Sequence, residues 1–152
     1  MTDTRRTFAS TPTLSALVAL TGRLLQERIG RDLEPLGISY AQAAALVRLW
    51  RRSARMPQAE MIRSLALSRT SGTIVLNELE QRGLIQRHPD DDDARRMVVQ
   101  LTDQGVDLEQ PVLRVFERVE AVMKAPLTDE EYESGHRILR ALLEEIRHDR
   151  RA

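Results

Sequence analysis

The sequence contains no cysteine and only five aromatic residues among its 152 positions. The lack of cysteine excludes disulfides, thiolate zinc sites, iron–sulfur clusters, thiol nucleophiles and thiol redox sensing. No apolar run approaches the roughly 18 residues of a membrane span, and no signal-peptide pattern is present at the start. We therefore expect a soluble, cytoplasmic protein. Its core should be aliphatic, because 21 leucines contribute to a hydrophobic content of 41%.

An excess of one charge is also lacking, since 23 basic and 23 acidic residues give a net charge of zero. The two signs are unevenly distributed. Residues 48–102 carry ten basic and seven acidic groups, whereas residues 103–152 carry eight and twelve. Such an asymmetry can orient a protein on nucleic acid, although an imbalance of this size also arises by chance.

The N-terminal third has the pattern of a long helix. Residues 1–11 are polar and are expected to be frayed. Apolar residues then recur at helical spacing and predict a helix over 13–34, which Pro35 and Gly37 should end.

Capping residues mark the start of three further helices. Ser39 with Gln42 predicts a capping box for the second helix. Pro57 is expected in the first turn of a short third helix. Ser68 is the predicted N-cap of a fourth helix, which should stop at Gly83.

After Gly83 the apolar period changes from 3.6 to 2, which predicts strands at 84–88 and 97–101. A fifth helix follows and should be kinked at Pro111, since proline interrupts helical hydrogen bonding. Thr128 with Glu131 predicts a capping box for a final helix.

A short helix, a tight turn, a second helix and a two-stranded hairpin form a winged helix-turn-helix. The helix over 69–82 would lie in the major groove of DNA, and the hairpin loop would reach the minor groove. The inward face of this helix is expected to contain Gly72 as the point of a close helix–helix approach, together with Val75, Leu76 and Leu79.

The opposite face of the same helix carries side chains that suit base edges and phosphates: Thr70, Thr73, Ile74, Asn77 and Gln81, with Arg69 and Ser71 at the N-terminal tip. The alternative is an ordinary solvated helix face. Ile74 favours DNA, because an exposed apolar residue suits a thymine methyl group better than water.

These segments resemble the signature of the MarR family of transcription regulators. The resemblance rests on residues 79–90, 93–95 and 99–102 with Gly105, and on the helix entry at 57–60. Together with the long flanking helices it covers roughly residues 12–148.

The resemblance implies a homodimer whose N- and C-terminal helices interlock and whose winged domains bind an inverted repeat. It also implies that Arg95 enters the minor groove with Asp93 orienting it, by a carboxylate–guanidinium fork that we expect in the loop. A small organic effector would bind where the dimer helices meet the winged domain and loosen DNA binding. Tyr40 and Trp50 are candidate lining residues, although both also suit a plain core role.

Three positions depart from the family pattern. Position 74, where the family often has arginine, is Ile74; position 43, often aromatic, is Ala43; and the wing carries four consecutive aspartates at 90–93. Acidic side chains repel phosphate, and we expect those other than Asp93 to be spacer acids facing solvent. The alternative function is therefore a helical protein-interaction module of the same fold that has lost DNA binding.

Catalysis and metal sensing find little support. His88, His136 and His148 lie far apart in the sequence, and Glu133 with His136 provides a single Glu-x-x-His where a di-iron bundle needs two. Phosphate-binding glycine loops, serine elbows and zinc-protease motifs are lacking. We predict neither an enzyme nor a metal or cofactor site.

The sequence thus predicts a mainly α (α+β) fold, a winged helix-turn-helix with long N- and C-terminal helices that form a dimerisation domain. Residues 1–38 and 103–152 would dimerise, and 39–102 would bind DNA. The function would be that of a ligand-responsive regulator, most simply a repressor, that binds an inverted-repeat operator in double-stranded DNA as a homodimer. The predicted DNA-binding residues are Gln58, Ser68, Arg69, Thr70, Ser71, Thr73, Ile74, Asn77, Arg87, Asp93, Arg95 and Arg96.

Overall fold

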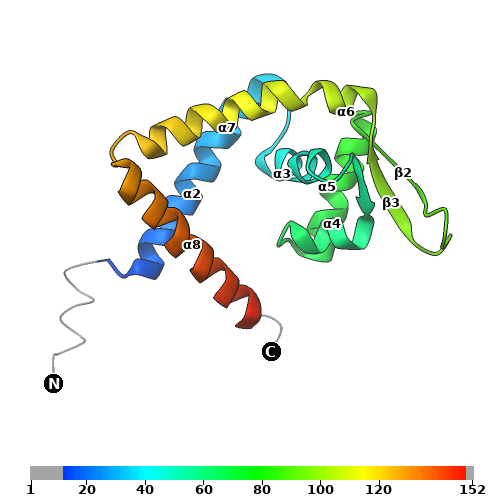
Figure 1. Ribbon diagram of the computed structural model, residues 1–152. Coiled ribbons are helices and arrows are strands. Elements are labelled where there is room, and N and C mark those ends of the chain that lie inside the picture. Colours follow the sequence, from blue (N-terminus) through cyan, green and yellow to red (C-terminus); the bar gives the residue numbers. More distant parts are fainter. Residues whose placement is uncertain (1–11, 150–152) are drawn as a thin grey trace. The chain divides into compact units, whose positions relative to one another are not determined.

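The computed structural model of the protein describes residues 12–149 and is mainly helical (Figure 1). The expectation for residues 1–11, and the last three residues of the predicted C-terminal region, lie outside the described residues. The chain divides into two compact units, one that runs to Val115 and one that begins at Phe116. Within residues 12–149, no helix is long and apolar enough to cross a membrane.

The first unit contains the predicted winged helix-turn-helix, which confirms the predicted fold class. Its elements in chain order are α2 (Leu14–Leu33), the 3₁₀ helix η1 (Glu34–Leu36), α3 (Tyr40–Trp50), β1 (Arg55–Pro57), α4 (Gln58–Ser64), α5 (Arg69–Gln81), β2 (Ile85–Pro89), β3 (Met97–Leu101) and α6 (Asp103–Asp107). The following helix, α7 (Glu109–Lys124), belongs to both units, and α8 (Asp129–Asp149) lies in the second.

The sheet has three antiparallel strands in the order β1-β3-β2. Strands β2 and β3 form the predicted wing hairpin, with Arg87 opposite Val99. Strand β1 was not predicted. Pro57 was expected in the first helical turn, but it ends β1 opposite Val98 and serves as the N-cap of α4. A three-residue edge strand with a proline has no apolar period of its own, and it is formed by pairing with β3.

The predicted helix starts are confirmed by their hydrogen bonds. Ser39 and Gln42 form both halves of a capping box, and the Ser68 side chain accepts from the backbone N–H of Ser71. Thr128 and Glu131 form a capping box at the start of α8, in which the side chain of each accepts from the backbone N–H of the other. These caps fix where α3, α5 and α8 begin.

The predicted fifth helix is two helices. The expected kink at Pro111 is a break, because α6 ends at Asp107 and α7 begins at Glu109. A proline ring clashes with the carbonyl of the residue four positions earlier, which here is Asp107. Proline is tolerated in the first turn of α7, where its missing N–H has no helical partner.

The core of the first unit is aliphatic, as predicted. Its largest fully buried side chains are Leu33, Leu46, Leu49, Met61, Leu76, Leu79, Ile85, Val98, Val99 and Val112. Gln42 is buried beside them, and its Nε2 donates to Glu78 Oε2 at 2.7 Å, which joins α3 to α5.

Two glycines allow close approaches that hold the winged unit together. A Cβ on Gly72 would lie 2.8 Å from Ile62 Cγ2, so α4 and α5 pack at the predicted contact. A Cβ on Gly105 would lie 2.1 Å from the carbonyl oxygen of Leu84, so α6 packs against the start of the wing. Gly83, at φ 68°, ends α5 in the left-handed region that favours glycine.

The second unit is a pair of helices with little buried surface of its own. Tyr132 on α8 donates to Glu120 on α7, and Lys124 pairs with Asp129 at 2.9 Å across the connection. Helix α8 contains no buried residue, although it carries a stripe of large apolar side chains about half exposed: Ile138, Leu139, Leu143 and Ile146.

Candidate nucleic-acid interface

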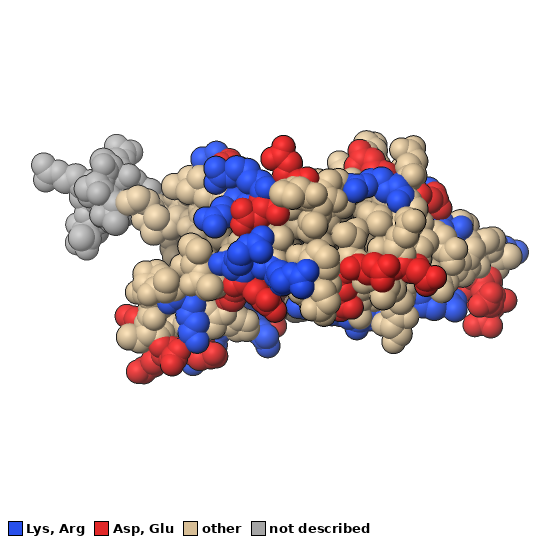
Figure 2. Space-filling model, turned by 90° about the horizontal axis from the view of Figure 1, so that it is seen from above, with Lys and Arg blue, Asp and Glu red and all other residues tan. Residues whose placement is uncertain are grey.

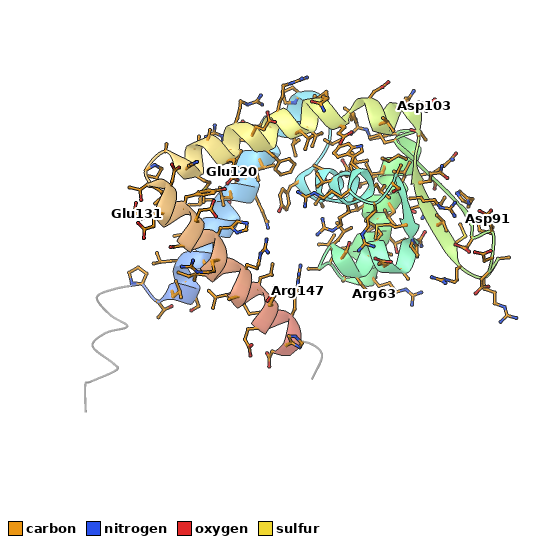
Figure 3. The ribbon with its side chains drawn as sticks, in the orientation of Figure 1. Arg63, Asp91, Asp103, Glu120, Glu131 and Arg147 are labelled. Atoms are coloured by element: carbon orange, nitrogen blue, oxygen red, sulfur yellow. The ribbon has the colours of Figure 1, made fainter. Side chains whose placement is uncertain are left out.

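An open groove of about 800 Å³ lies between α4, the first turns of α5 and the wing. The residues that line it lie up to 40 positions apart in the sequence. The groove is lined by Pro57, Gln58, Ala59, Glu60, Ile62, Arg63, Leu67, Arg69, Thr73, Arg95, Arg96 and Met97. Figure 3 labels Arg63 on α4 and Asp91 on the β2–β3 hairpin, the two parts that border it.

Arginines without an internal partner gather at this groove. Of the ten arginines in residues 48–102, five have side chains bound within the protein: Arg48, Arg52, Arg55, Arg82 and Arg87. Among residues 12–149, the side chains of the other five make no hydrogen bond or ion pair, and four of these five line the groove: Arg63, Arg69, Arg95 and Arg96. The groove therefore concentrates positive charge that the protein does not neutralise, which is the electrostatic requirement for binding a polyanion.

The rest of the surface has no such concentration in the view that is shown. On the face seen in Figure 2, basic and acidic side chains alternate over short distances. The zero net charge of the chain thus describes a mixed surface and says little about the groove.

Helix α5 presents its polar face beside the groove. Gly72, Val75, Leu76 and Leu79 are buried as predicted, which turns the opposite face outward. Ile74 on that face is 51% exposed, so its side chain is accessible to a partner. The hydroxyl of Thr73 donates to the carbonyl of Arg69 at 2.8 Å, so Thr73 presents a methyl group and an acceptor oxygen to its surroundings.

The wing loop is shaped by its aspartates. Asp93 Oδ1 accepts from the backbone N–H of Arg95 at 3.1 Å, and the Asp93 carbonyl accepts from the N–H of Arg96 at 2.8 Å. The expected fork between the Asp93 carboxylate and the Arg95 guanidinium is wrong for this structure. The carboxylate fixes the backbone that carries Arg95, and the guanidinium extends without an internal partner in residues 12–149.

The other wing aspartates differ from the expected row of solvent-facing spacers. Asp90 Oδ1 accepts from the backbone N–H of Asp92 at 3.0 Å, and Asp91 forms an ion pair with Arg55 on β1 at 3.6 Å. Within the described residues, Asp92 is the one member of the run whose carboxylate has no partner. One of the four carboxylates is therefore paired with a basic group, and two others bind the backbone of the loop.

An ion-pair network joins the wing to α5. Arg87 Nε on β2 donates to Glu80 Oε2 at 3.0 Å, and the Arg87 backbone N–H donates to Glu80 Oε1 at 3.1 Å. Arg87 Nη2 also donates to Asn77 Oδ1 at 2.8 Å. The side-chain hydrogen bonds from Arg87 lower the pKa of Glu80 below its usual value, more than its partial burial raises it.

The predicted DNA-binding residues fall into three groups in the structure. The groove contains Gln58, Arg69, Thr73, Arg95 and Arg96. The exposed part of α5 and its cap contains Ser68, Thr70, Ser71, Ile74 and Asn77. Arg87 is turned to Glu80 and is only 18% exposed, and Asp93 is engaged with the loop backbone. Sequence reasoning missed Arg63, although the basic excess of residues 48–102 included it.

The two candidate effector-lining aromatics have different surroundings. The indole Nε1 of Trp50 donates to the Gly105 carbonyl at 3.1 Å, so this half-buried side chain joins α3 to α6. Tyr40 is also half-buried, in the first turn of α3. A role of either residue in binding an effector stays a prediction.

Comparisons with known proteins agree on one family. The model of the MarR family matches residues 38–97. The chain is 34% identical over 95 residues to the transcriptional repressor MprA of Escherichia coli K12, a match that covers 62% of this chain and 53% of MprA. It is 31% identical over 102 residues to the organic hydroperoxide resistance transcriptional regulator of Bacillus subtilis, covering 67% of this chain and 69% of that protein. The match thus spans about half the length of MprA.

The fold is also that of a solved protein–DNA complex. The crystal structure of the Staphylococcus aureus MepR–DNA complex superposes with a TM-score of 0.80 at 24% identity. The match covers 89% of this chain and 99% of the MepR chain, so it includes the long helices on both sides of the winged unit.

Proposed function

This chain belongs to the MarR family, and we propose that it is a ligand-responsive transcriptional repressor that binds an inverted-repeat operator in double-stranded DNA as a homodimer. The observation that carries the proposal is the groove between α4, α5 and the wing, where four arginines that have no side-chain partner within residues 12–149 surround one end of the exposed face of α5. The names of the similar proteins, a repressor, a regulator and a DNA complex, support the same function.

In this proposal α5 occupies the major groove and the wing reaches the neighbouring minor groove. Arg95 would enter the minor groove, where a guanidinium is attracted by the negative potential of a narrow A/T tract. Ile74 would contact a thymine methyl group, and Arg63, Arg69 and Arg96 would bind phosphates.

The homodimer is proposed from uncovered apolar surface. Leu14, Leu17 and Leu24 on α2 are about half exposed, as is the apolar stripe of α8. A second copy of the chain would cover these faces, with residues 1–38 and 103–152 as the dimerisation region and 39–102 as the DNA-binding region. A two-fold dimer places two copies of α5 about 34 Å apart, one turn of DNA, and so explains an inverted repeat.

Two variants with equally exposed side chains separate dimerisation from DNA binding. Leu143 on α8 is 48% exposed and Ile74 on α5 is 51% exposed. Leu143→Asp should shift the protein toward monomer in light scattering at micromolar concentration, whereas Ile74→Asp should stay dimeric and lose DNA binding. A monomeric wild-type protein would refute the proposed assembly.

The effector is proposed to be a small organic molecule. Thiol oxidation cannot release this protein from DNA, because the printed sequence has no cysteine. Peroxide at doses that leave methionine unmodified should therefore leave DNA binding unchanged, and release at such doses would contradict the proposal.

The direct test of function is binding to the DNA upstream of the protein's own gene, with footprinting at low and moderate salt. We expect protection of an inverted repeat by the wild type and by Arg51→Ala, an exposed variant outside the groove, and weaker protection by Arg95→Ala. Absence of binding to any of this DNA would favour the alternative, an interaction module that has lost DNA binding. The acidic wing was one of the reasons for that alternative, and the internal contacts of Asp90, Asp91 and Asp93 weaken this reason.

A further inference from the structure

Asn77 lies on the exposed face of α5, one turn after Thr73 and Ile74, and a hydrogen bond from β2 orients its side-chain amide. Arg87 Nη2 lies 2.8 Å from the amide oxygen, Asn77 Oδ1. Arginine has only hydrogen-bond donors, so the atom that faces it must be the oxygen of the amide. The amide nitrogen of Asn77 is consequently the group left to face outward.

Arg87 is itself held in place by Glu80. The guanidinium and the backbone N–H of Arg87 bind the two oxygens of the Glu80 carboxylate, at 3.0 and 3.1 Å. The Arg87 side chain is only 18% exposed. If Arg87 turned toward a phosphate, it would leave an unpaired carboxylate near the DNA backbone, so the network of Glu80, Arg87 and Asn77 resists rearrangement on binding.

We propose, on the basis of the proposed function, that Asn77 is a specificity-determining residue whose amide is fixed as a donor by Arg87 and therefore selects guanine over adenine. Asparagine ordinarily pairs with adenine in the major groove, where its oxygen accepts from N6 and its nitrogen donates to N7. Here Arg87 takes one of the two lone pairs of that oxygen and holds it toward β2, which leaves the nitrogen as the outward group. Guanine presents two adjacent acceptors, O6 and N7, which match an outward amide nitrogen, whereas adenine presents an N6 donor that this nitrogen cannot accept.

Arg87 is accordingly a positioning residue. It acts on the base through the orientation of the Asn77 amide, and Arg63, Arg69 and Arg96 in the groove supply the contacts to phosphate. Removing Arg87 should therefore change which base is preferred, an effect that lost charge or a looser wing does not produce.

The test is selection of the full-length protein on a pool of randomised DNA duplexes, followed by affinity measurements on selected sequences in which single base pairs are exchanged. Asn77→Ala identifies the base pair that depends on Asn77. At that pair we expect the wild type to prefer guanine over adenine about tenfold. Arg87→Met releases the amide and should reduce this preference to near unity or invert it. Glu80→Gln, which keeps the shape of the network, should have a smaller effect in the same direction.

Arg51→Met, at an exposed position outside the groove, loses the same charge outside the network and should keep the wild-type preference. Thermal unfolding of Arg87→Met followed by circular dichroism shows whether the variant is folded. If it is not folded, the base preference of Glu80→Gln decides the test. Adenine at the Asn77-dependent pair in the wild type, or a preference that Asn77→Ala leaves unchanged, overturns the inference while the proposed function stands. A pool in which the wild type enriches no sequence overturns both.

Discussion

Salt dependence tests whether the groove arginines bind phosphate. Each phosphate contact made by a basic side chain releases condensed counterions, so the logarithm of the binding constant falls with the logarithm of salt concentration at about 0.9 per contact. The three arginines proposed to bind phosphate in each groove, Arg63, Arg69 and Arg96, and the two grooves of the proposed dimer give a slope of about −5. Operator binding should therefore weaken about 10³-fold between 50 and 200 mM salt.

The perturbation is Arg63→Gln, at a residue that the family resemblance did not indicate. Because the dimer carries two copies, the slope should decrease in magnitude by about 2. Arg51→Gln is the matched control: Arg51 is also exposed and likewise lacks a side-chain partner within residues 12–149, but it lies outside the groove. It should leave the slope unchanged.

The assay is fluorescence anisotropy of a labelled operator duplex at several salt concentrations. A wild-type slope shallower than about −3, or an equal change in the Arg51→Gln and Arg63→Gln variants, would refute the reasoning. The first result would mean that the groove does not contact the backbone, and the second that the effect is one of overall charge.

Three further predictions concern the wing and its supports. Arg95→Ala should weaken operator binding by about 1–3 kcal/mol, whereas Asp92→Asn should leave it unchanged or slightly tighter, and equal titration curves for Arg95→Ala and wild type would exclude a groove contact. Gly105→Ala should lower the free energy of unfolding by about 2–4 kcal/mol in urea titrations at fixed protein concentration, because of the clash with the Leu84 carbonyl. Gly30→Ala, with open space around it in α2, should raise that free energy by about 0.5–1 kcal/mol, and the same sign for both would contradict the packing argument. The pKa of Glu80 is lowered in the folded state, so its contribution to stability is present above about pH 4.5 and is lost as the pH falls further. Glu80→Gln should therefore flatten the acid side of a plot of the free energy of unfolding against pH. The control is Glu117→Gln, at an exposed position on α7, which should leave the plot unchanged.

Local signals in the sequence predicted the helices and the wing. The capping boxes at Ser39 and Thr128, the cap at Ser68 and the stop at Gly83 all act within four residues, so the sequence alone contains both partners of each hydrogen bond. Gly72 was found because the inward face of α5 could be read from its helical spacing. Strand β1 was missed because its three residues gain their structure from β3, about 40 positions away.

The site was predicted less completely, because the state of an arginine depends on its tertiary partner. Arg87 and Arg95 are both basic residues of the wing. The family resemblance makes Arg95 a candidate DNA-binding residue, and the position in the hairpin makes Arg87 another. The structure gives Arg87 a carboxylate from α5 and leaves Arg95 free of side-chain partners in residues 12–149. The sequence could not distinguish the two arginines. Glu80 is one of seven acidic residues in residues 48–102, and no local pattern predicts that it pairs with Arg87.

The role of the acidic run at 90–93 also depends on contacts that the sequence does not show. Four aspartates beside a DNA-binding arginine appear unfavourable when charges are counted along the sequence. In the hairpin, however, Asp90 and Asp93 accept backbone N–H groups that the tight turn would otherwise leave without partners, and Asp91 is neutralised by Arg55. Aspartate is suited to this task because its short side chain reaches the N–H two residues ahead. The acidic residues thus stabilise the backbone conformation that presents Arg95 and Arg96 to the groove, and their charge is the cost of a rigid loop.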